Sequence, residues 1–303
     1  MINMNTFGVI GSFWEFHRIV DPLINPPPDQ PAFHVVIPSL PGFGFSSPPP
    51  SKEWTMRHNA KVFDHLMTGV LGYTAYMAQG GDWGSFITRI LGSDDFPACK
   101  MINLNMLNGR PPLTALLTLP FFLLPTDWRK WLFSQVYSEE ELNDFDRSFK
   151  FAKSGLGYFL QNHTKPMTIG YVLYDNPLGI LAWIGEKYKE HVDPDILPSL
   201  IQDVLTTVSL YFLSRTAHTS GVPYKENGRL FNERHPITKP YGVSRFPFDI
   251  FIEPVSWSRK DNPGDLVFVR RHRRGGHFAA LEAPELLAGD LREMVTGHWA
   301  RLT

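Results

Sequence analysis

The chain has 303 residues, 43% of them hydrophobic and 19% charged, so it is long enough for one large core with an insertion and too apolar to be disordered. Its net charge of −1 excludes a general attraction to nucleic acid or to anionic membranes, which depends on clustered Lys and Arg. The single cysteine, Cys99, excludes an internal disulfide and predicts a reducing compartment, so we expect a cytoplasmic protein.

Strand-like and helical segments alternate in the first third of the chain. Residues 34–37 are predicted to form a strand, residues 56–71 a helix and residues 73–78 a second strand. A helix is expected after Trp83, and residues 100–104 form another strand-like run. This alternation is typical of a mostly parallel sheet covered by helices, and it predicts the α/β class.

The pattern changes after residue 110 to helical, aromatic-rich segments without strands between them. We interpret residues 111–236 as a helical lid inserted between two parts of one core, residues 1–110 and 237–303. The apolar run of residues 113–124 is too short for a membrane span of about 20 residues, which favours a buried lid segment. The remaining predicted elements are lid helices at 127–136, 139–152, 180–188 and 200–213, core strands at 249–252 and 266–269, and a closing helix at 284–303.

Asp82 stands at the centre of Gly-Gly-Asp-Trp-Gly, residues 80–84, after the apolar run of residues 73–78. A strand that turns sharply into a helix with a reactive side chain at the apex is the nucleophile elbow of Gly-x-Ser-x-Gly enzymes. With a carboxylate in place of serine, attack on an electrophilic sp³ carbon leaves an alkyl ester on the enzyme. A glycine-rich turn with a helix-capping aspartate is the alternative interpretation.

A histidine and a second acid complete a plausible catalytic order. His277 follows two glycines after strand-like residues 266–269, and Asp249 lies upstream after another strand-like segment. The order of nucleophile, acid and histidine is that of α/β-hydrolases and not of the two unrelated protease arrangements. Each residue alone is more readily a structural histidine or a loop acid, but together with Asp82 they predict a triad.

Metal and cofactor motifs do not occur in the sequence. It contains no His-Glu-x-x-His spacing, no paired cysteines and no glycine-rich nucleotide loop, so we expect metal-free, cofactor-independent chemistry. Residues 1–5 lack the features of a signal peptide, and no membrane span is predicted. Association with a membrane surface and homodimer formation stay open. The basic run of residues 270–274 is interpreted as a solvated strand exit in preference to a binding patch.

The elbow and the histidine segment together resemble epoxide hydrolases of the microsomal type, in particular their fungal branch, within the α/β-hydrolase superfamily. The resemblance covers nearly the whole chain from Gly11 onward, and its motifs are specific as a set. Besides residues 80–84, they are residues 11–16, residues 38–46, Lys165-Pro166 and residues 275–278.

The resemblance implies a role for five side chains. Asp82 is the nucleophile, His277 is the general base, and Asp249 is the acid that orients this base. Two lid tyrosines, Tyr158 and Tyr224, match the family pattern as donors to the epoxide oxygen. Such donors suit the chemistry because the ring oxygen becomes an alkoxide during attack. Most of the chain's ten tyrosines are expected to be amphipathic core residues, which is the alternative for these two.

The implied reaction is hydrolysis of a small apolar epoxide to a vicinal diol through an alkyl ester on Asp82. Detoxification and the tailoring of secondary metabolites are the implied settings. A dehalogenase is the second hypothesis, since it also uses an aspartate elbow, although with halide donors in place of tyrosines. A degenerate, catalytically weak homologue is the third, because fold and function separate readily.

The sequence departs from the family pattern near its start. Relatives carry a His-Gly-Trp-Pro-Gly turn that helps to form the oxyanion hole, and the same positions, residues 7–11, read Phe-Gly-Val-Ile-Gly here. Backbone N–H groups survive these replacements, so Val9 and Trp83 are the predicted oxyanion donors. Relatives also have strands before this turn. We therefore predict an N-terminally truncated chain with impaired activity, whose sheet lacks its N-terminal strands unless residues 2–7 supply one short replacement.

Overall fold

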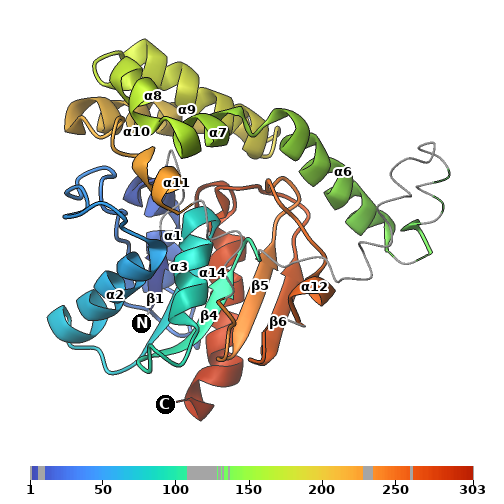
Figure 1. The fold of residues 1–303 in the computed structure, drawn as a ribbon. Helices are drawn as coiled ribbons and strands as arrows, with labels where there is room; N and C mark the ends of the chain where they lie inside the picture. Colours follow the sequence, from blue (N-terminus) through green and yellow to red (C-terminus); the bar gives the residue numbers. More distant parts are fainter. Residues whose placement is uncertain are drawn as a thin grey trace.

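Six parallel strands form one sheet in the order β2-β1-β3-β4-β5-β6 (Figure 1). The computed structural model describes residues 2–5, 11–107, 128, 131, 133–135, 137–227, 235–259 and 262–302. The predicted α/β class with a parallel sheet is confirmed. The strands are β1 (Ile2–Asn5), β2 (Val35–Val36), β3 (Tyr76–Gly80), β4 (Cys99–Leu104), β5 (Tyr241–Arg245) and β6 (Leu266–Arg271).

Strand β1 lies between β2 and β3, at the position that we expected to be empty unless residues 2–7 supplied a short strand. It pairs in parallel with β2 at Ile2↔Val35 and with β3 from Ile2↔Met77 to Asn5↔Gly80. The expectation of a sheet without this strand is therefore wrong, and the short replacement supplies it. The physical reason is that an empty place would leave two rows of backbone groups unpaired, at about 1–3 kcal/mol for each buried group.

Helices cover both faces of the sheet (Figure 1). Helices α2 (Met56–His65) and α3 (Asp82–Leu91) contact each other in front of the sheet, in the view of Figure 1. Helices α1 (His17–Ile24) and α14 (Pro284–His298) contact each other behind it. This arrangement buries every residue of β3 and β5, as expected for central strands of a parallel sheet.

The segment between β4 and β5 contains helices that form a layer above the sheet (Figure 1). The predicted helices at 139–152, 180–188 and 200–213 are confirmed by three of them, whereas half of the residues of the one at 127–136 lie outside the described residues. The boundaries of the lid and of the two core parts stay a prediction. The helices are α6 (Glu139–Ser154), α7 (Gly157–Thr164), α8 (Pro166–Leu173), α9 (Pro177–His191), α10 (Ile201–Ser214) and α11 (Val222–Glu226).

The strand predicted at residues 249–252 is wrong, because the strand of this region is β5 and Asp249 lies in the loop after it. Pro247 has no backbone N–H to continue the ladder. Strand β5 itself carries little sequence signal. A Cβ at Gly242 would lie 2.3 Å from the sulfur of Met294, so a side chain there would require the Met294 side chain of α14 to move. The apolar run after β5 packs as a buried loop.

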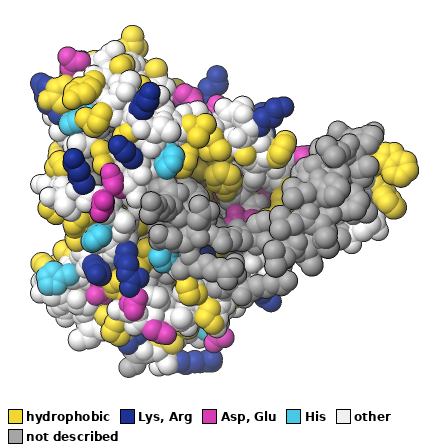
Figure 2. Space-filling view, viewed as in Figure 1, with side chains coloured by type: hydrophobic (Ala, Val, Ile, Leu, Met, Phe, Trp, Pro, Cys, Tyr) yellow, Lys and Arg dark blue, Asp and Glu magenta, His cyan; other side chains and the backbone are white. Residues whose placement is uncertain are grey.

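The surface carries mixed charge. Figure 2 shows basic and acidic side chains interspersed on the face it draws, in agreement with the net charge of −1. In the basic run, Arg270 pairs with Asp290 at 3.0 Å and Arg271 binds Asp144. Within the described residues, no helix is long and apolar enough to cross a membrane. The apolar run of residues 113–124 lies outside them.

Candidate active site

The turn between β3 and α3 places Asp82 at the apex of a tight elbow. Asp82 has φ +46°, in the left-handed region that a short polar side chain tolerates better than most. Gly80 is required by the close approach of strand and helix, because a Cβ there would lie 2.3 Å from the carbonyl oxygen of Gly84. The strand, turn and helix predicted from residues 80–84 are therefore present, with the carboxylate at the bend.

The Asp82 carboxylate is held on two sides, and the Asp82 residue as a whole is 9% exposed. Its Oδ1 accepts a hydrogen bond from the backbone N–H of Trp83 at 2.7 Å. Its Oδ2 lies 3.4 Å from Nε2 of His277. The Trp83 N–H therefore donates to an oxygen of the Asp82 carboxylate, as a predicted oxyanion donor should. Val9, the other predicted donor, lies outside the described residues.

His277 stands between two carboxylates. Its Nδ1 lies 2.7 Å from Oδ1 of Asp249, and that same oxygen accepts the backbone N–H of Ile250 at 2.7 Å. Burial alone would lower the pKa of His277, but Asp249 and Asp82 outweigh it and raise this pKa to about 10. The imidazole is therefore a cation while both carboxylates are charged.

The loop that carries His277 is held by hydrogen bonds to residues that the sequence did not indicate. The backbone N–H of His277 donates to the carbonyl of His191 at 2.9 Å. Glu282 accepts the backbone N–H groups of Phe278 and Asp193, each at 2.8 Å. Burial raises the pKa of Glu282 to about 7. Glu282 belongs to the histidine segment, but no local pattern distinguishes this role from that of any other helix residue.

His191 itself is a buried, neutral imidazole beside that of His277. Its ring centroid lies 5.7 Å from that of His277, and its pKa is lowered well below the usual value by burial and by the positive charge of His277. A second cation beside His277 would be repelled, so the pair shares one positive charge.

The two predicted tyrosines come from α7 and α11, which pack against each other. The rings of Tyr158 and Tyr224 lie 6.0 Å apart at 76°, and the ring of Tyr224 meets that of Trp83 edge-on at 4.9 Å. Burial raises the pKa of the Tyr158 phenol, and the negative charge of Asp82 adds to this shift. The Tyr158 phenol therefore stays protonated and able to donate.

A cavity of about 260 Å³ joins these groups. Asp82 lies in its wall together with both tyrosines, and most of the remaining lining is apolar. A site of this composition suits a small apolar guest that is oriented by a few polar groups. The other lining residues are Trp83, Phe86, Met106, Leu156, Phe159, Ile250 and Phe251.

A buried cation that the sequence did not indicate lies next to this cavity. Lys187 is 1% exposed, and its Nζ lies 4.3 Å from the ring centroid of Tyr158 and 2.7 Å from Oε1 of Glu186. A cation over an aromatic face is attracted by the ring. Lys187 therefore supports the position of Tyr158 in the cavity wall.

The structure thus brings together all five side chains to which roles were assigned. Asp82, Asp249 and His277 form one continuous chain of contacts, and Tyr158 and Tyr224 share a cavity with Asp82. Their catalytic roles stay a prediction. The arrangement can deliver a carboxylate nucleophile, a paired imidazole and two phenolic donors to one guest.

Comparison with known proteins agrees with this geometry. The family model of the alpha/beta hydrolase fold matches residues 8–161. The chain is 39% identical over 295 residues to a putative epoxide hydrolase of Stigmatella aurantiaca, covering 95% of this chain and 62% of the relative. It is 33% identical over 307 residues to epoxide hydrolase 1 of Sus scrofa, covering 94% and 65%. The chain thus spans less than two thirds of the length of these curated relatives.

Solved structures give the same match in three dimensions. The epoxide hydrolase of Aspergillus niger superposes with a TM-score of 0.82 at 39% identity, covering 98% of this chain and 72% of that one. A haloalkane dehalogenase from Bradyrhizobium elkanii matches with a TM-score of 0.61 at 14% identity, which is a likeness of fold alone.

Proposed function

The chain belongs to the α/β-hydrolase family and, within it, to the epoxide hydrolases, and from that premise we propose that it hydrolyses apolar epoxides to vicinal diols. One observation carries the proposal. Asp82 and two phenols open onto a single apolar cavity, and His277 and Asp249 stand in line behind the carboxylate. A serine at the apex would favour acyl transfer, whereas a carboxylate favours attack on the sp³ carbon of an oxirane.

In the first step, Oδ2 of Asp82 attacks a ring carbon and the bond from that carbon to the ring oxygen breaks. The product is an alkyl ester on Asp82 with an alkoxide on the neighbouring carbon. Tyr158 and Tyr224 hydrogen-bond this oxygen, and one of them gives it a proton and becomes a tyrosinate. Oδ1 stays with the N–H of Trp83 and becomes the carbonyl oxygen of the ester.

In the second step, the imidazolium of His277 first releases its proton to solvent. Water then attacks the carbonyl carbon of the ester, and a proton of this water passes to the neutral imidazole of His277. The charge on Oδ1 is met by the N–H of Trp83, and the tetrahedral intermediate collapses to release the diol. The leaving oxygen takes its proton from His277, while the acid re-formed on Asp82 loses its proton. That proton returns to the tyrosinate and His277 regains its own proton from solvent, so the sum is epoxide plus water giving diol.

The charge on Asp82 links the two steps. In the free enzyme, the pKa of His277 is about 10 because two carboxylates face the imidazole. Esterification removes the charge of Asp82, so this pKa falls and the imidazole becomes a base when hydrolysis needs one. Ester hydrolysis is therefore expected to become faster with rising pH and to level off below pH 10.

The test is a single turnover with excess enzyme in heavy-oxygen water. If the ester forms, the diol carries ordinary oxygen from the carboxylate, and the heavy label appears in the peptide that contains Asp82. Direct attack of water on the epoxide would place the label in the diol instead, and this result would overturn the covalent mechanism. Absence of diol from several aryl and alkyl epoxides would favour the degenerate homologue, and release of halide from haloalkanes would favour the dehalogenase.

The tyrosines make a prediction of their own. We expect Tyr158→Phe and Tyr224→Phe each to slow ester formation by about 10²–10³-fold, because each removes one donor to the developing alkoxide. Ester formation is followed by rapid-quench mass spectrometry. Tyr171→Phe is the matched control, since Tyr171 lies on α8 and is 74% exposed. An effect at Tyr158 no larger than that at Tyr171 would remove Tyr158 from the mechanism.

The biological setting belongs to the same proposal. An apolar cavity suits the detoxification of apolar epoxides as well as the tailoring of metabolites. We propose a cytoplasmic location on the ground that the single cysteine, Cys99, is buried and unpaired. Association with a membrane surface is the alternative to a free protein, and a homodimer is the alternative to a monomer.

A further inference from the structure

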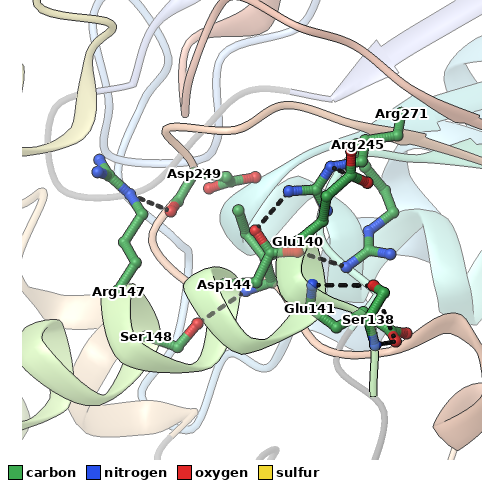
Figure 3. A network of polar contacts seen from close by, with 10 residues as sticks. Ser138, Glu140, Glu141, Asp144, Arg147, Ser148, Arg245, Asp249 and Arg271 are labelled. Atoms are coloured by element: carbon green, nitrogen blue, oxygen red, sulfur yellow. Dashed lines mark hydrogen bonds and ion pairs between the residues drawn. The ribbon is translucent and has the colours of Figure 1, made fainter. Parts of the chain in front are cut away.

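Helix α6 is locked to the ends of β5 and β6 by a buried carboxylate (Figure 3). Asp144 is 3% exposed, and it accepts from Arg245 at 3.1 Å and from Arg271 at 2.8 Å. The helix begins with a capping box, in which Ser138 and Glu141 bond to each other's backbone N–H. The position of α6 on the core is thus determined independently of the catalytic triad.

One turn further along α6, Arg147 reaches the loop that carries Asp249 (Figure 3). Its Nε donates to the carbonyl of Asp249 at 3.1 Å, and its Nη2 donates to the carbonyl of Phe248 at 2.9 Å. The guanidinium also lies 5.0 Å from the ring centroid of Phe248. Arg147 therefore holds the backbone at Asp249, while the side chain of Asp249 contacts His277.

The same guanidinium reaches the second support of the imidazole. Nη2 of Arg147 donates to the carbonyl of Glu190 at 3.3 Å, at the end of α9. The next carbonyl, that of His191, accepts the backbone N–H of His277 at 2.9 Å. One side chain thus ties together the two segments that fix His277, one at its ring and one at its backbone.

We propose that Arg147 is a positioning residue that aligns Asp249 and His277 for hydrolysis of the ester. This inference rests on the proposed function. The loop from β5 to α12 (Val255–Arg259) is paired with the His277 loop by an isolated bridge, Phe248↔Gly276. Arg147 adds hydrogen bonds to the carbonyls of Phe248 and Asp249. Without the guanidinium, these carbonyls lose the hydrogen bonds from Arg147, and the loop is held less firmly. Misplacement of a catalytic group by about 1 Å can cost 10²-fold in rate.

Attack by Asp82 depends much less on this support. The Asp82 carboxylate is set by the elbow and by the N–H of Trp83, neither of which contacts Arg147. Loss of Arg147 should therefore separate the two steps. The charged and titratable groups around the guanidinium are the carboxylates of Asp249, Glu282, Asp144 and Asp193 and, in the recess beside it, Lys150, Lys189, Glu190 and His191.

The experiment compares Arg147→Met with Asp144→Asn, which loosens the same helix without touching the Asp249 loop. Rapid-quench mass spectrometry measures ester formation and ester hydrolysis separately. We expect ester formation by Arg147→Met to stay close to the wild-type rate and hydrolysis to fall about 10- to 100-fold, so that the ester accumulates. In Asp144→Asn, the ratio of the two rates should stay at the wild-type value. Equal slowing of both steps in both variants would reduce Arg147 to a structural anchor and overturn the proposal.

A second measurement does not depend on turnover. In enzyme with labelled histidines, the titration of His277 is followed by NMR and assigned with His277→Gln. Arg147→Met should shift the His277 titration to lower pH than in wild type, whereas Arg147→Lys should restore part of the difference. An unchanged titration in a folded Arg147→Met protein contradicts the proposal. The wild type could fail to turn over epoxides while Arg147→Met still shifts the His277 titration as expected. That result would refute only the proposed function.

Discussion

Replacing Asp82 by asparagine is expected to lower the rate of diol formation by about 10⁴-fold or more, the scale found when a triad nucleophile is removed. An amide does not attack an oxirane carbon as a carboxylate does, so no ester forms. Asparagine is the sharpest choice because it tolerates the left-handed backbone at φ +46° and can still accept the N–H of Trp83. Diol formation is measured by chromatography with an aryl epoxide in excess.

The matched control is Asp29→Asn. Asp29 also has a positive φ, of 66°, but it is exposed and distant in sequence from the elbow. It should keep wild-type activity and stability. Activity of Asp82→Asn within tenfold of wild type, in a protein that unfolds at the same urea concentration, would rule out Asp82 as the nucleophile.

Replacing His277 by glutamine is expected to stop the reaction after its first step. Glutamine fills similar space and can hydrogen-bond Asp249, but it cannot take a proton from water. General-base catalysis contributes about 10²–10⁴-fold, so hydrolysis should slow by that factor while Asp82 still attacks. Incubation with an apolar epoxide should then add the mass of one substrate molecule to the peptide that contains Asp82.

The control for this variant is His65→Gln, an exposed histidine at the end of α2, which should show no adduct. The position of the added mass decides the mechanism, since an ester on any residue other than Asp82 would contradict the assignment of the nucleophile. A folded His277→Gln protein that binds epoxide without forming an adduct would exclude a covalent intermediate altogether.

The positions of Asp82 and His277 could be predicted from the sequence because their signals are local. The glycines around Asp82 fit only a tight strand-to-helix turn, since a Cβ at Gly80 would clash with the backbone at Gly84. The two glycines before His277 act similarly, because Gly275 has φ +89° and a Cβ at Gly276 would lie 2.5 Å from the carbonyl of His191. Turn chemistry of this kind is legible in a few consecutive residues.

Other features left no such trace. Strand β5 was missed because Gly242 and Ser244 are not typical strand residues. Their contacts are with residues far along the chain, Met294 for Gly242 and Asn103 for Ser244. The apolar residues after it resemble a strand but pack as a loop. In the same way, Arg147 is one basic residue among many on a helix surface until the fold brings it to the carbonyls of Phe248 and Asp249.

The prediction of Asp82 as the nucleophile, the predicted order of the catalytic groups and the α/β class follow from residue types and their spacing, because these record backbone requirements that act over a few positions. Three other features depend on contacts between segments far apart in the chain. They are the central position of β1 in the sheet, the loop that presents Asp249, and the hydrogen bonds from Arg147 to that loop. Such contacts form only when the whole core closes, so a local pattern carries no record of them.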